Sequence, residues 1–154
     1  MTTPFRKAAR IVAVTGIGAL AVVQLVPYGR HHTNPPVKQE PAWNHPETRA
    51  LAARACFDCH SNETHWPWYA HVAPFSWLVQ RDVDVGRRVV NFSEWDRPHE
   101  EADESAETVL EGEMPPAAYV LLHPAARLTS EQKRSLANGL AATIGSQAGD
   151  SDGN

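Results

Sequence analysis

The chain has 154 residues, enough for one small domain with additional segments. All 18 acidic residues lie after residue 30, together with only 10 of the 14 basic ones, so this part carries a net charge of about −8 with neutral histidines. This negative charge argues against nucleic acid or an anionic membrane surface as a partner.

The amino terminus carries basic residues, Arg6, Lys7 and Arg10, followed by an apolar run over residues 11–26. This order is typical of a chain that is sent across a membrane. We predict that residues 1–28 form an uncleaved transmembrane anchor, because the span 8–26 is just long enough to cross a bilayer. The alternative is a signal peptide that is cleaved near Ala19-Leu20-Ala21.

The positive-inside rule then leaves the amino end in the cytoplasm and residues after 30 outside the cytoplasmic membrane of a bacterium. Residues 29–43 are polar and contain three prolines, so we expect an extended linker. A domain over residues 44–144 follows, and residues 145–154 are predicted to be a disordered tail.

The first helix of the domain is predicted to begin near residues 44–46 and to continue through residue 60. It ends in Cys56-Phe57-Asp58-Cys59-His60, the C-x-x-C-H pattern by which c-type haem is attached. Two thiols on one helical turn can each form a thioether with the porphyrin, and the next residue, His60, can bind the iron. The motif uses both cysteines of the chain.

The motif has three alternative interpretations. A disulfide between cysteines three positions apart would be strained, and a thioredoxin-like site requires a βαβ pattern that the chain lacks. A zinc site requires four ligands, which Cys56 and Cys59 could complete with His60 and His65. The export context favours haem, because c-type haem is attached outside the bacterial cytoplasm.

Further helices are predicted after the motif. Residues 76–90 and 102–110 carry amphipathic patterns, residues 117–128 are predicted as a loop, and a last helix extends from 129 to about 144. The acidic stretch 94–113 is a solvated surface or a docking patch for a basic redox partner. The predicted fold is therefore all-α, a small domain similar to a c-type cytochrome, with loops around one haem.

Met114 is the predicted second axial ligand. It lies in a Glu-Met-Pro-Pro loop between two helices, and the only other methionine is Met1. The prolines stiffen the loop, so that a thioether can be held at iron with little ordering cost. The alternatives are His71, His123 or an open sixth position.

The sequence from about residue 34 to 144 resembles a bacterial family known as the haem-binding domain family. Five segments carry the resemblance: CFDCHSNETHWPWY (56–69), APFSW (73–77), NFSEW (91–95), GEMPP (112–116) and LLHPAARLT (121–129). The resemblance implies haem binding through Cys56, Cys59 and His60, and a secreted or membrane-anchored location. It implies no enzymatic activity.

The expected function is one-electron transfer outside the cytoplasmic membrane by a covalently bound haem c with His60 and Met114 as ligands. The expected partners are the cytochrome maturation machinery, a redox protein of unknown identity, and the membrane through the amino-terminal helix. One alternative is a haem sensor or peroxidase-like enzyme with an open sixth site. The other is a zinc-binding module.

Overall fold

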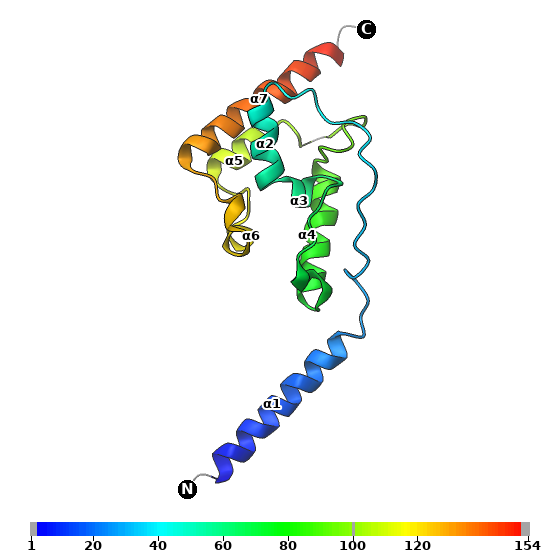
Figure 1. Ribbon diagram of the computed structural model, residues 1–154, viewed down its shortest axis with the longest axis vertical. Helices are drawn as coiled ribbons and strands as arrows, with labels where there is room; N and C mark the ends of the chain where they lie inside the picture. Colours follow the sequence, from blue (N-terminus) through cyan, green and yellow to red (C-terminus); the bar gives the residue numbers. More distant parts are fainter. Residues whose placement is uncertain (1–2, 100, 152–154) are drawn as a thin grey trace. The chain divides into compact units, whose positions relative to one another are not determined.

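The computed structural model describes residues 3–99 and 101–151. These residues form seven α-helices and two short 3₁₀ helices, with one isolated parallel bridge between Gln39 and Glu94 and no strand, which confirms the all-α prediction (Figure 1). In chain order the elements are α1 (Thr3–Val23), α2 (Pro46–Ala55), α3 (Phe57–His60), η1 (Trp68–His71), α4 (Phe75–Val89), α5 (Ser105–Glu111), α6 (Ala117–Leu122), η2 (Pro124–Ala126) and α7 (Ser130–Ser151).

The predicted transmembrane anchor is wrong. Among the residues described, none of the helices combines the length and the apolar character needed to cross a bilayer. Helix α1 carries Arg6, Lys7 and Arg10 in its first half and ends at Val23. Its apolar part, residues 11–23, therefore extends only about 20 Å, against the ~30 Å of a hydrocarbon core.

The chain divides into two compact units. The first unit comprises residues 1–32 and 66–81, and the second comprises residues 33–65 and 82–154. Within the first unit, the Gln24 side chain exchanges two hydrogen bonds with the backbone of Ala73, with its amide donating over 2.8 Å and its oxygen accepting over 3.1 Å. The ring of His32 stacks on Trp66 at a centroid distance of 4.3 Å.

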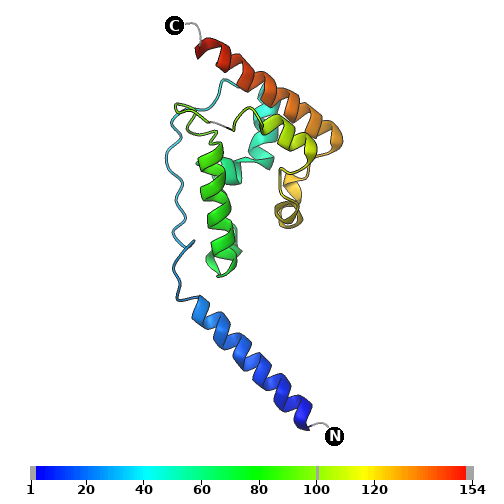
Figure 2. The same ribbon diagram turned by 180° about the vertical axis from the view of Figure 1, so that it is seen from behind.

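The second unit is built on the amphipathic faces of three helices. Helices α2 and α5 both pack against α7, and the three lie side by side in both views (Figures 1 and 2). The apolar residues Leu136, Leu140 and Ile144 of α7 face this core, and the two leucines are fully buried. Gly139 allows α2 to approach closely, because a Cβ at that position would overlap the side chain of Thr48.

Two boundaries differ from those predicted. Residues 117–122 form α6 instead of a loop, because a six-residue helix is too short to show an apolar period. Helix α7 continues to Ser151, so residues 145–151 are helical instead of disordered; extending an existing helix costs less than starting one. Residues 152–154 of the predicted tail lie outside the described residues.

The predicted linker is only partly a spacer. Its second half runs along the segment 93–95, where Lys38 N–H donates to Ser93 and Trp95 N–H donates to Gln39 over 2.9 Å each. Trp43 then packs against the aromatic rings of Phe57 and Phe92. Residues 33–43 therefore belong to the second unit, because an aromatic anchor and backbone hydrogen bonds offset the cost of ordering an extended segment.

Candidate haem site

The C-x-x-C-H motif lies where α2 ends and α3 begins. Cys56 ends α2, with its N–H bonded to Ala52 over 2.7 Å, and the single turn of α3 carries Cys59 and His60. The amides of both residues donate to the carbonyl of Cys56, over 3.1 and 2.9 Å. The predicted continuous helix thus breaks at Cys56 and restarts at once, which keeps the three side chains on one short turn.

The two cysteine side chains are half-buried. Burial raises the pKa of Cys56 to about 12, with a smaller contribution from Cys59. Burial likewise raises the pKa of Cys59 to about 12, helped by the charges of Asp82 and Asp58. Both groups are therefore neutral thiols near pH 7 while no metal is bound to them.

The hydrogen bonding of His60 indicates which of its two ring nitrogens carries the proton. Its Nδ1 lies 3.1 Å from the carbonyl oxygen of Val90. A carbonyl oxygen only accepts, so Nδ1 carries the proton and Nε2 keeps its lone pair. Burial lowers the pKa of His60 and favours this neutral form. A half-buried, neutral imidazole oriented by a backbone carbonyl is the arrangement that metal-binding histidines use.

Helix α4 contacts the motif through Gly86. A Cβ on this residue would lie 2.9 Å from the Cys59 carbonyl carbon and closer still to its oxygen. Only glycine permits this approach, which places Val90, one turn later, beside His60. The distance of Gly86 in sequence from the motif hid this contact.

The segment after the motif is locked by buried polar side chains. Asn62 is 3% exposed; its amide donates to Pro36 over 3.1 Å, and its oxygen accepts from Asn91 over 2.9 Å. Its backbone N–H donates to the Ser93 hydroxyl over 2.9 Å. Arg87 donates to the Ser61 carbonyl over 2.8 Å. These contacts join the segment 61–64 to the segment 91–95.

Met114 lies in the same unit, half-buried in the loop between α5 and α6. Gly112 ends α5 with φ = +82°, and the amides of Glu113 and Met114 both donate to the Thr108 carbonyl over 3.1 and 3.3 Å. On the other side of the loop, the Tyr119 hydroxyl donates to the Asp58 carboxylate over 2.6 Å. The structure thus connects α6, the helix that follows the methionine loop, to the haem motif.

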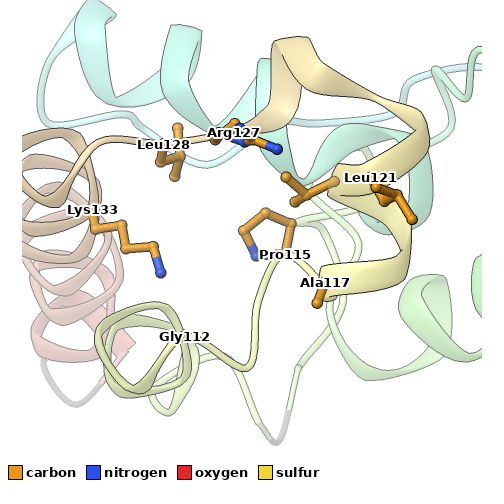
Figure 3. A pocket seen from close by; sticks show the side chains of 8 residues that line it. Gly112, Pro115, Ala117, Leu121, Arg127, Leu128 and Lys133 are labelled. Carbon is orange, nitrogen blue, oxygen red and sulfur yellow. The ribbon is translucent and has the colours of Figure 1, made fainter.

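A pocket of about 330 Å³ opens next to this loop. Figure 3 shows Pro115 and Ala117 at its edge and the Lys133 side chain reaching toward it from α7. Leucines 121 and 128 line its apolar wall. The methionine loop is therefore not backed by close packing on the side of the pocket.

The other histidines occupy different surroundings. The side chain of His65 is 93% exposed and lies 3.4 Å from Asp58. His71 belongs to the first unit, against the ring of His32. His123 ends α6 and stacks on Tyr119 at 4.1 Å. Within the described part of the chain, no three His, Cys, Asp or Glu side chains converge as a metal site would require, so the zinc alternative gains no support.

The comparison with known families agrees with this site. Residues 18–142 match the family model described as the haem-binding domain. The chain therefore belongs to the haem-binding domain family, as its motifs predicted, and its cofactor is haem. No curated protein and no solved structure matches the chain.

Proposed function

We propose that the chain carries one covalently bound haem c and transfers single electrons outside the cytoplasm. In this proposal Cys56 and Cys59 hold the haem through thioether bonds. His60 is the proximal ligand and Met114 the distal one. With a histidine and a methionine as ligands, the iron would be low-spin, at a raised potential, and would exchange one electron with little change in geometry.

The orientation of His60 is the observation that carries the proposal. The bond from Nδ1 to Val90 leaves Nε2 as the only nitrogen that can bind iron, and burial keeps the ring neutral. Because the chain positions this ligand by its own backbone, little ordering is needed when the haem binds. Because the two thiols lie on the same turn, both can form thioether bonds with one porphyrin.

Met114 is proposed as the distal ligand on three grounds. It lies in the unit that contains His60, it is half-buried, and hydrogen bonds on both sides hold its loop. A thioether is a soft ligand that suits haem iron in electron carriers. No acid or base of the chain is needed for this function.

We infer a location outside the cytoplasm from the basic residues followed by the apolar part of α1. This part, residues 11–23, has the length of the apolar region of a secretory signal. The cytochrome maturation machinery is then the partner that attaches the haem. The redox partner would be a protein that tolerates the acidic surface of the second unit.

Optical spectra of the full chain from cells with the maturation machinery test this function. The reduced protein should show a low-spin c-type spectrum that carbon monoxide does not change. Met114→Ala should make the haem high-spin and reactive with carbon monoxide, whereas Leu110→Ala, at an exposed position of α5, should not. If the native protein binds carbon monoxide or peroxide rapidly, the sensor or peroxidase-like alternative is correct.

A further inference from the structure

One hydrogen bond joins the two sides of the proposed haem site. The Tyr119 hydroxyl in α6 donates to Oδ2 of Asp58 over 2.6 Å, across 61 positions of the chain. Asp58 lies between Cys56 and Cys59, inside the haem motif itself. Tyr119 comes five positions after Met114, with two prolines between them.

The Asp58 end of this bond is fixed. Its second carboxylate oxygen accepts from the backbone N–H of His65 over 3.0 Å. Its carbonyl accepts from the Thr64 hydroxyl over 2.8 Å. Asp58 therefore cannot follow Tyr119 if α6 moves, because the turn after the motif holds its carboxylate in place.

The Met114 loop is short and is held at both ends. On one side the amides of Glu113 and Met114 are bonded to the last turn of α5. On the other side Pro115 and Pro116 leave little freedom before α6 begins at Ala117. The pocket beside the loop means that packing alone does not fix it. The Tyr119 bond therefore adds a direct link between α6 and the motif.

We propose that Tyr119 is a positioning residue that, through Asp58, holds the Met114 loop against the haem and keeps the sixth iron position closed. This inference rests on the proposed His60 and Met114 ligation. The hydroxyl does not touch the iron. It limits how often the methionine side of the site moves away from the histidine side.

The size of the effect follows from the type of bond. A hydrogen bond to a charged group contributes about 1.5–3 kcal/mol, which corresponds to about a tenfold to a hundredfold change in an equilibrium. Carbon monoxide binds to such an iron only when methionine is displaced. Removing the hydroxyl should therefore speed carbon monoxide binding by about tenfold to a hundredfold.

Tyr119→Phe tests this in the haem-loaded full chain, with Tyr69→Phe as the matched control. Tyr69 belongs to the first unit, where its ring contacts Trp68 and Phe75. We expect Tyr119→Phe to speed carbon monoxide binding. It should also reduce the low-intensity red absorption band of iron(III) bound to a thioether. Tyr69→Phe should change neither. Unchanged binding in Tyr119→Phe would overturn the proposal.

A double-mutant cycle separates positioning from a general loss of stability. Asp58→Ala should have an effect similar to that of Tyr119→Phe, and the double variant should bind carbon monoxide no faster than the faster single variant. Additive effects would mean that the two residues act independently, which contradicts the proposal.

Hydrogen exchange tests the positioning role of Tyr119 separately from the proposed ligation by Met114. The amides of Val120 and His123 donate within α6, to Pro116 and Tyr119. Their exchange should be at least tenfold faster in Tyr119→Phe than in Tyr69→Phe. If Met114→Ala leaves the native spectrum unchanged, the proposed ligation has failed; faster exchange would then still show that Tyr119 holds α6. Equal exchange in the two variants would refute the positioning role itself.

Discussion

The two sides of the proposed haem site are built in different ways. On the histidine side, Asn62, Asn91 and Ser93 form a buried polar network, and α4 contacts the motif through its backbone. On the methionine side, a short loop is held by the end of α5 and by one side-chain bond, with a pocket beside it. The histidine is therefore placed in advance, while the methionine depends on a few contacts.

This difference has a physical consequence. Buried, satisfied hydrogen bonds specify one arrangement and are costly to break, because each lost partner leaves a desolvated group behind. A loop next to a pocket loses less when it moves. Changes on the histidine side should therefore destabilise the whole unit, and changes on the methionine side should act mainly on the sixth ligand.

Gly86→Ala should have the largest effect on stability. The added methyl would overlap the carbonyl of Cys59, and backbone atoms cannot turn aside as a side chain can. We expect a loss of about 3 kcal/mol in the free energy of unfolding, measured by urea denaturation. Gly145→Ala is the control, because nothing lies within 4 Å of its added Cβ. Equal stability of the two variants would show that α4 does not contact the motif closely.

Asn62→Ala should have the next largest effect on stability. It leaves the buried amide of Asn91 without its acceptor and removes the donor to Pro36, at a cost of about 2 kcal/mol. Asn138→Ala, at an exposed position of α7, should stay within about 0.5 kcal/mol of the native protein. A harmless Asn62→Ala would mean that the polar network does not hold the histidine side.

Gly112→Ala tests the methionine side at its α5 anchor. The residue has φ = +82°, where a side chain costs about 1 kcal/mol. Asn tolerates this conformation better, so Gly112→Asn should lie between alanine and the native residue. Faster carbon monoxide binding should accompany the loss of stability. If Gly112→Ala cost more than Asn62→Ala, the contrast between the two sides would be wrong.

Glu94→Gln should have the smallest effect, visible as pH dependence. Hydrogen bonding from Asn62 lowers the pKa of Glu94, with further help from Arg97 and Lys38, against the effect of burial. A lowered folded pKa means that this stability is present at neutral pH and is lost as pH falls below about 5, through the folded pKa. The pH slope of the unfolding free energy should therefore decrease in Glu94→Gln and in Asn62→Ala. An unchanged slope in both would contradict the assignment.

Local signals predicted the all-α class, the last helix and the membership of the haem-binding domain family correctly. The capping box at Thr129 and Gln132 is present, with reciprocal bonds of 3.0 and 3.1 Å. At the start of α2, His45 caps the helix by accepting a hydrogen bond from the amide of Glu47. Asn44 bonds to Thr143, which is far away in the sequence and could not be foreseen.

The parts that could not be predicted depend on contacts between distant segments. Val90, Gly86 and Asn91 support His60 from α4 and from the segment that follows it, and no local pattern marks them as partners of the motif. The transmembrane prediction failed for a related reason. It treated residues 24–26 as part of the membrane span, whereas the helix ends at Val23 and Gln24 bonds to the backbone of Ala73.

The most direct test of the central claim is the mass of the protein purified from cells with the cytochrome maturation machinery, after denaturation. A chain that carries haem c should retain the mass of one haem, and the double variant Cys56→Ser, Cys59→Ser should lose it. A native chain that loses the haem on denaturation would contradict covalent attachment at these cysteines.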